Sequence, residues 1–280
     1  MTVYNLAQGG LGNRLLAIQS AIHLSKMYET KLIVCWPVND ECGIAFHKLF
    51  DTDIEEVDYC PRPDKGFIRL GVIPPHITEY RQFDDVTPII FERVTETKLF
   101  LNSLRHVDVY FSDWQTRCFA TFSPLKFKDE YIQKANDFVL KNNVSATLHI
   151  RGTDAEFKNV EDEDIERMIY NRGIPLTLFV CSDEKAHEDR IVNAGPSRVA
   201  RQDKEWPTKK DKSKPFLIAK GNYNVHRSEQ VVIDGVIDML VMSKTPVIFG
   251  NLYSSLANYA HLMFKEEHPG DSSRYIILNN

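Results

Sequence analysis

The first 36 residues alternate between β-rich and helical patterns, and this alternation strongly limits the folds that the chain can adopt. Residues 2–6 (TVYNL) favour a strand, apolar residues recur at helical spacing over 11–22, and residues 31–36 (KLIVCW) favour a second, buried strand. A helix that connects two strands of one sheet makes those strands parallel. The N-terminal part is therefore predicted to contain a parallel sheet covered by helices.

The same alternation returns in the C-terminal half. The expected elements there are helices over 127–143, 161–173, 183–195, 228–244 and 254–264, and strands over 146–151, 175–181, 246–250 and 275–278. Between 60 and 125 the pattern predicts only loops and short elements. The 280 residues exceed an ordinary single core, so we expect two doubly wound α/β domains, 1–127 and 128–280.

Composition excludes several classes of partner. The chain has 34 basic and 39 acidic side chains and a net charge of -5, so it offers no broad basic face for nucleic acid. No apolar run approaches the roughly 20 residues that span a bilayer, and no basic segment precedes an apolar one at the start. We therefore expect no membrane span, a cytoplasmic location and no nucleic-acid partner; oligomeric state has no signature in the sequence.

The turn after the first expected strand resembles a dinucleotide-binding fingerprint without completing it. Residues 10–15 (GLGNRL) nearly fit G-x-G-x-x-G/A, but Leu15 stands where a small residue is needed. The acid expected on the second strand is missing from 31–36, and no G-K-[ST] follows. An NAD-dependent enzyme stays only as a minor alternative.

The glycines of this turn still have a physical use. Gly9, Gly10 and Gly12 let the backbone come close to a ligand, and a helix N-terminus favours negative charge. A tight turn without any ligand is the alternative interpretation.

A second candidate lies at the end of the expected strand over 146–151. The period of two places His149 and Arg151 on the same side, with Asp154 and Glu156 just beyond the strand. A guanidinium suits a diphosphate because it stays charged and contacts two oxygens, and a nearby carboxylate can act as general base. A simple ion pair between Arg151 and Asp154 is the alternative.

Two C-terminal helices offer further candidates. Asp234 and Asp238 are four residues apart on one face of an otherwise apolar helix, so they need solvent, a partner or a ligand. Ser254 or Ser255 can cap the next helix, and such a helix start can also bind phosphate. A solvated stripe and plain capping are the respective alternatives.

We predict no metal site. Asp51 and Asp53 form a D-x-D sequence, but no apolar strand precedes it; the five cysteines show no C-x-x-C spacing, and no H-E-x-x-H occurs.

Four segments, taken in order, resemble the fucosyltransferase-like superfamily of two-domain GT-B enzymes, which includes α1,6-fucosyltransferases of N-glycans and rhizobial lipooligosaccharides and protein O-fucosyltransferases. Residues 9–37 resemble the N-terminal G-x-x-x-N turn, helix and strand of that superfamily. Residues 149–154 (HIRGTD) resemble its H-x-R-R-T-D motif, and 178–184 (LFVCSDE) its strand ending in Ser/Thr and paired acids. Residues 236–260 resemble its V-D-x-x-x-L-S…F-S-S…A segment.

The resemblance implies two Rossmann-like doubly wound domains that face each other across a cleft. It implies that the donor nucleotide-sugar, GDP-fucose in that superfamily, contacts residues of all four segments. The donor-binding candidates are Gly10, Gly12, Asn13 and Arg14 beside the cleft, His149 and Arg151 at the nucleotide and its diphosphate, Ser182 and Asp183 after the third segment, Asp238 at the base, and Ser254 or Ser255 at phosphate.

The activity that the resemblance implies is an inverting, metal-independent transfer of a sugar to a hydroxyl of a glycan acceptor, with no cofactor besides the donor. Arg151 would stabilise the leaving diphosphate, and Glu156, or else Asp154, would be the base. Gly152 departs from the motif, which has a second arginine there, so a UDP-sugar such as UDP-xylose or another GDP-sugar is an alternative donor. A nucleotide-binding module without catalysis is a further alternative. A bacterial or viral setting fits the expected cytosolic location.

Overall fold

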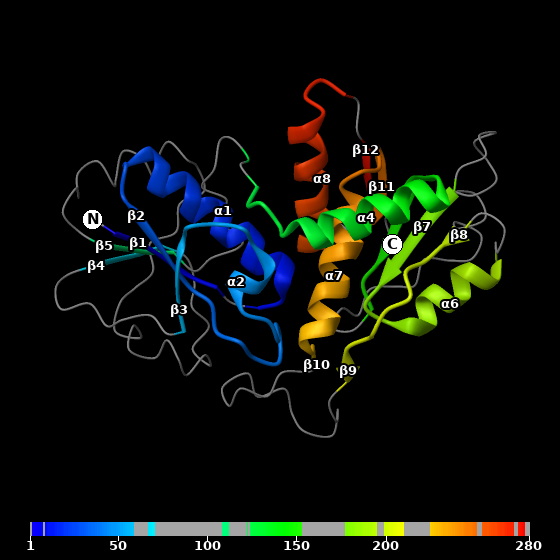
Figure 1. Ribbon diagram of the computed structural model, residues 1–280, viewed down its shortest axis with the longest axis horizontal. Helices are drawn as coiled ribbons and strands as arrows, with labels where there is room; N and C mark the ends of the chain where they lie inside the picture. The colour runs from blue at the N-terminus through cyan, green and yellow to red at the C-terminus, as the bar shows by residue number, and fades with distance from the viewer. Residues whose placement is uncertain are drawn as a thin grey trace. The chain divides into compact units, whose positions relative to one another are not determined.

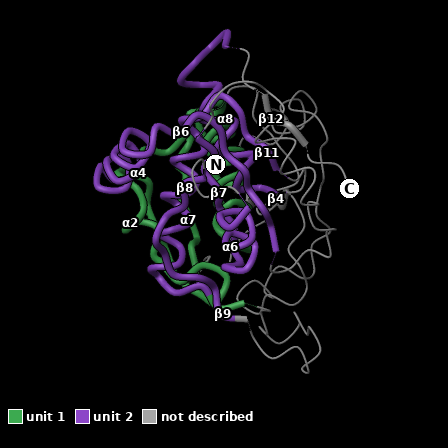
Figure 2. The backbone as a smooth tube through the Cα atoms, turned by 90° about the vertical axis from the view of Figure 1, so that its right-hand side faces the viewer, with its two compact units in different colours: residues 1–126, 210–226 green, residues 127–209, 227–280 purple. Residues whose placement is uncertain are grey.

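A computed structural model of the chain describes residues 2–7, 9–58, 67–70, 108–111, 122, 124–152, 177–194, 199–209, 225–250, 254–271 and 274–277. The chain divides into two compact units, which Figure 2 colours separately. Unit 1 comprises residues 1–126 and 210–226, and unit 2 comprises residues 127–209 and 227–280. The predicted domain boundary at 127/128 stays a prediction, and each unit is described by itself.

Unit 1 contains a five-stranded parallel sheet (Figure 1). Its elements are β1 (Thr2–Leu6), α1 (Leu11–Met27), β2 (Lys31–Cys35), α2 (Phe46–Leu49), β3 (Glu55–Val57), β4 (Phe67–Leu70) and β5 (Asp108–Phe111), with the short strand β10 (Val225–His226) later in the chain. The strand order is β3-β2-β1-β5-β4, and every pairing is parallel. Helix α1 packs on β1, β2 and β5. The turn between β1 and α1 directly follows β1, which is the central strand, so this turn lies at the carboxyl end of that strand.

Unit 2 contains a second five-stranded parallel sheet (Figure 1). Its elements are α4 (Asp129–Asn142), β6 (Val144–Ile150), β7 (Thr177–Ser182), α6 (Lys185–Ala194), β8 (Val199–Ala200), β9 (Thr208–Lys209), α7 (Glu229–Met242), β11 (Val247–Gly250), α8 (Ser255–Glu267) and β12 (Arg274–Ile277). The order β12-β11-β6-β7-β8 places the first strand of the unit in the middle, with later strands added first on one side and then on the other. This order is that of a doubly wound nucleotide-binding sheet, whose ligand crevice lies where the order reverses, between β6 and β11.

The two faces of the unit 2 sheet are covered by different helices. Leu148 and Val180 belong to a buried cluster that includes Ile191 of α6. On the opposite face the Phe179 ring meets Phe138 of α4 at a centroid distance of 5.2 Å, and α4 in turn packs on α7. Side chains alternate between the faces of a strand, so this burial on both sides explains why β6 and β7 are almost continuously apolar.

The predicted α/β class with parallel sheets is confirmed. Most expected elements are present, including α4, which ends at Asn143 in a left-handed conformation with φ 48°. The sequence interpretation missed α2, β3, β8, β9 and β10, which are all short. The helix expected over 161–173 lies outside the described residues.

Candidate functional site

Three turns of unit 2 lie at the carboxyl edge of its sheet, on neighbouring strands. Ile150 at the end of β6 is in register with Ser182 at the end of β7, and Phe249 of β11 pairs with Leu148. The residues that follow are Arg151 after β6, Asp183 after β7 and, four positions after the end of β11, Ser254. We call this group of three turns the carboxyl edge of unit 2. The sheet therefore brings together the predicted residues of the second, third and fourth sequence segments.

A hydrogen bond from a backbone N–H to a carboxylate connects two of these turns. The N–H of Gly152 donates to Oδ1 of Asp183 over 2.7 Å, which fixes the chain directly after Arg151 to the turn after β7. A Cβ atom at position 152 would lie 2.8 Å from the ring of His187, so the close approach requires glycine. His187, on the first turn of α6, therefore fills the space where a side chain at position 152 would begin.

His149 lies on β6 just below Arg151. The residue is 9% exposed, and its Nδ1 atom has no hydrogen-bond partner among the described residues. Burial lowers the pKa of His149 to about 4, against a smaller upward effect of Asp183, so the imidazole is neutral at pH 7. A neutral buried imidazole can contact a ligand by hydrogen bonding but adds no positive charge to a diphosphate site.

Ser182 is held by three hydrogen bonds at the end of β7. Its N–H donates to Oε1 of Glu188 over 2.8 Å, and its Oγ accepts from the N–H of Glu184 over 3.1 Å. Its carbonyl oxygen accepts from Nζ of Lys204 over 2.9 Å. The serine therefore shapes the turn, with Oγ serving as a local cap.

Ser254 and Ser255 take the positions expected for the start of α8. Ser254 is the N-cap, and its Oγ accepts from the N–H of Ala257 over 3.2 Å. Ser255 is the first helical residue and is partly exposed. The capping function predicted for this pair is confirmed for Ser254, while phosphate binding stays a prediction.

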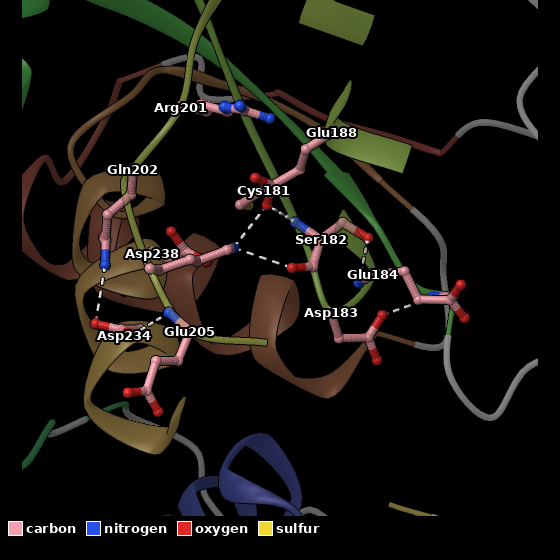
Figure 3. Close-up of polar contacts among 12 residues, drawn as sticks. Cys181, Ser182, Asp183, Glu184, Glu188, Arg201, Gln202, Glu205, Asp234 and Asp238 are labelled. Atoms are coloured by element: carbon pink, nitrogen blue, oxygen red, sulfur yellow. Dashed lines mark hydrogen bonds and ion pairs between the residues drawn. The ribbon is translucent and has the colours of Figure 1, made fainter. Parts of the chain in front are cut away.

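A buried ionic cluster lies behind the turn after β7. Lys204 contacts Oε1 of Glu188 at 2.6 Å and Oδ2 of Asp238 at 2.5 Å, and all three side chains are nearly inaccessible. Figure 3 shows Glu188 of α6, Ser182 of β7 and Asp238 of α7 converging on this point. The structure thus gives Asp238 a lysine partner; its predicted contact with a nucleotide base stays a prediction.

Burial and mutual attraction set the protonation of this cluster. Burial raises the pKa of Asp238 to about 6 and also raises that of Glu188, although Lys204 pulls both pKa values down. Burial would lower the pKa of Lys204, but Asp238 and Glu188 outweigh it and the net shift is upward. The lysine is therefore charged at pH 7.

Sequence reasoning missed Lys204, which lies in the irregular stretch between β8 and β9 that we call the 201–207 segment. Asp234 accepts from the N–H of Glu205 over 2.9 Å and from Nε2 of Gln202 over 3.3 Å, as Figure 3 shows. Both acids on the buried face of α7 therefore have partners in this segment. The available signal was the acid pair on an apolar helix, which required a partner without saying where it lies.

The glycine turn of unit 1 has the geometry expected of a close-approach loop. Gly9 has φ +73°, and a Cβ there would lie 2.9 Å from Nδ2 of Asn13. Gly10 is the N-cap of α1 and has no side chain to close the helix start, and no acidic residue lies in the first turn. The backbone at the start of α1 therefore has the polarity that suits an anion.

Arg14 braces this turn from inside unit 1. The side chain is fully buried; its Nε donates to the carbonyl of Gly9 over 2.7 Å and one terminal nitrogen to that of Pro37 over 2.8 Å. The other terminal nitrogen donates to Oδ1 of Asn39 over 3.0 Å, and the guanidinium carbon lies 4.9 Å from the Trp36 ring centroid. Each nitrogen is thus used within the unit, and a direct contact of Arg14 with a donor stays a prediction.

The two candidate bases, Asp154 and Glu156, lie outside the described residues. Within the described ranges, no three His, Cys, Asp or Glu side chains gather closely enough to hold a metal ion. Asp51 of the D-x-D sequence is exposed and pairs with Lys126 at 3.0 Å. None of the helices in the described part of the chain is both long and apolar enough to cross a membrane.

Comparison with known proteins identifies the fold. No protein-family model matches the sequence, and no curated protein is detectably similar to it. Among solved structures, the fucosyltransferase NodZ from Bradyrhizobium matches with a TM-score of 0.58 and 14% identity, over 94% of this chain and 92% of that one. A structure of POFUT1 in complex with GDP matches with a TM-score of 0.57 and 14% identity, over 99% and 97% of the two chains. The chain therefore has a fucosyltransferase-like fold, as the sequence resemblance implied.

Proposed function

We propose that the protein is an inverting GT-B glycosyltransferase whose nucleotide-sugar donor binds at the carboxyl edge of unit 2. The observation that supports this most is the strand order of unit 2, with Arg151 directly after β6 at the point where the order reverses. The fold shared with fucosyltransferases agrees with this proposal.

GDP-fucose is the proposed donor. NodZ has been crystallised with GDP and soaked with GDP-fucose, and POFUT1 has been crystallised with GDP-fucose. In this chain Arg151 would contact the diphosphate, and the start of α8 at Ser254 and Ser255 would supply further N–H donors. In unit 1, the backbone of Gly10 and Gly12 would approach the donor, with Asn13 beside it.

The proposed reaction is a direct displacement at the anomeric carbon. An acceptor hydroxyl oxygen of a glycan bonds to that carbon while the bond from the carbon to the diphosphate oxygen breaks, and configuration inverts. Glu156 or Asp154 takes the hydroxyl proton. Arg151 and helix N-termini stabilise the negative charge that develops on the nucleoside diphosphate, which requires no metal ion in this scheme. We also propose a cytoplasmic location in a bacterial or viral setting.

Substitution of Arg151 tests the proposal. Arg151→Ala should lower turnover of the correct donor by about 10² to 10³, the effect of removing one group that stabilises developing charge. Arg151→Lys keeps the charge but loses the bidentate contact, so its activity should lie between that of the wild type and that of Arg151→Ala. Near-normal turnover by Arg151→Ala, measured with radiolabelled donor, would overturn the assignment of this edge.

A donor panel separates the remaining alternatives. GDP, UDP, GDP-fucose, UDP-xylose and NAD are compared by thermal shift, and donor hydrolysis is measured in parallel. The proposed function predicts stabilisation by GDP and hydrolysis of GDP-fucose. A UDP-xylose enzyme would respond to UDP instead, an inactive module would bind a diphosphate without hydrolysis, and an NAD-dependent enzyme would respond to NAD alone.

A further inference from the structure

Lys204 occupies an unusual position for a lysine. Its side chain is 4% exposed, and its ammonium group has three acceptors, which are the carbonyl oxygen of Ser182 and the carboxylates of Glu188 and Asp238. An ammonium group has three N–H donors, so each has one acceptor. Burial of such a group needs complete pairing, which this arrangement supplies.

These contacts lead from α7 to the backbone beside Arg151. Lys204 binds the carbonyl of Ser182, and Glu188, which Lys204 also contacts, accepts from the N–H of the same serine. The next residue, Asp183, accepts from the N–H of Gly152. Both backbone groups of Ser182 are thus fixed, which fixes the direction in which Asp183 leaves the strand.

We propose that Lys204 is a positioning residue that orients the turn after β7 and, through Asp183, the Arg151–Gly152 backbone at the carboxyl edge of unit 2. This inference rests on the proposed function for its catalytic meaning, since that backbone is where the donor diphosphate would bind. Lys204 touches no substrate in this scheme.

Charge balance is the competing role, because the lysine also neutralises two buried carboxylates. The two roles differ in one contact: charge balance needs only Glu188 and Asp238, whereas positioning needs the carbonyl of Ser182. Lys204→Met removes both the charge and that contact. Adding Glu188→Gln and Asp238→Asn removes the unbalanced charges, and Gln still has an oxygen to accept the N–H of Ser182. Because Asp238 is also a candidate contact of the donor base, exchange at Gly152 is the measurement that isolates the missing Ser182 contact in the triple variant.

The experiment compares Lys204→Met and the triple variant with the wild type by amide hydrogen exchange at Gly152 and by calorimetric binding of GDP. We expect exchange at Gly152 to be at least about 10-fold faster in both variants, and GDP affinity to fall by a similar factor. The matched control is Lys185→Met. Lys185 lies over the same Trp206 ring, at 5.7 Å against 5.9 Å for Lys204, but it is exposed and pairs with Asp189.

Each result decides between the roles. Recovery of slow exchange and GDP affinity in the triple variant, or no change in Lys204→Met, overturns the positioning role. If Lys204→Met does not fold, the triple variant decides alone through exchange at Gly152. A wild type that binds no nucleoside diphosphate refutes the proposed function, while exchange at Gly152 still tests whether Lys204 orients the turn.

Discussion

Gly152 shows how one absent side chain shapes the carboxyl edge of unit 2. The related sequence motif has arginine at this position, whereas here the ring of His187 would lie 2.8 Å from any Cβ at 152. The two residues therefore form a size-matched pair. Arg151 is the remaining arginine of the motif, and its backbone neighbour is tied to Asp183 instead of presenting a second guanidinium.

Gly152→Ala should therefore destabilise the protein, by about 1–3 kcal/mol as is usual for overpacking. His187→Ala should remove most of that cost, because Cγ of Glu184, the other close atom at 2.9 Å, belongs to a flexible side chain that can move. Urea unfolding of both single variants and the double variant measures the coupling.

Gly235→Ala is the control for this pair. A Cβ at that position of α7 meets nothing within 4 Å, so alanine should stabilise the helix by roughly 1 kcal/mol. If Gly152→Ala lowers the free energy of unfolding equally with and without His187, residues 152 and 187 are not matched in size.

At the scale of elements, the start of α8 can be tested against that of α7. Ser254 and Ser228 are both N-caps whose Oγ accepts an N–H over 3.2 Å. Replacing either by alanine should cost about 1 kcal/mol of stability. Only Ser254→Ala should also weaken GDP binding, by roughly 3- to 10-fold. Ser228 lies 3.2 Å from the Glu205 carboxylate, which would repel a phosphate. Calorimetry measures the GDP affinity of both variants. Equal losses of GDP affinity would show that the start of α8 does not bind the donor.

The sequence predicted the elements that are long enough to show a clear hydrophobic pattern. Helix α1 and strand β7 are long and regular, and both are where the pattern placed them. Strand β3 has only three residues, two of them glutamate, and it is a strand because β2 offers an unpaired edge beside it. Its existence depends on tertiary pairing, which no local pattern records.

The candidate site was predicted to a similar depth. Ser182 ends a strand, and Arg151 and Ser254 follow strands, so the rule that ligands lie at the carboxyl ends of parallel strands pointed to these candidates. Lys204 follows a strand of two residues and contacts acids 16 residues before it and 34 after it. Contacts at such separations depend on the folded unit, and no local sequence pattern records them.

At the scale of the whole molecule, two buried groups of unit 2 make opposite contributions to stability in acid. Burial lowers the pKa of His149 from 6.5 to about 4, so the unfolded chain binds that proton first and stability is lost as the pH falls through this range. Burial raises the pKa of Asp238 from 3.8 to about 6, so the folded protein binds that proton first and stability is gained over nearly the same range. Each contribution is on the order of 3 kcal/mol, and they offset each other.

Replacing either group should therefore leave the contribution of the other to the pH dependence of stability uncompensated. Between pH 6.5 and 4, the free energy of unfolding of His149→Gln should rise relative to the wild type as the pH falls, because the variant lacks the loss of stability that His149 causes. That of Asp238→Asn should fall relative to the wild type over the same interval, whatever constant cost comes from losing the contact with Lys204. Urea unfolding at four pH values measures both differences, and the wild type cancels every other titrating group. Two differences that do not change with pH would show that these groups titrate alike in the folded and unfolded chain, and slopes of the same sign would mean that burial does not act on them in opposite directions.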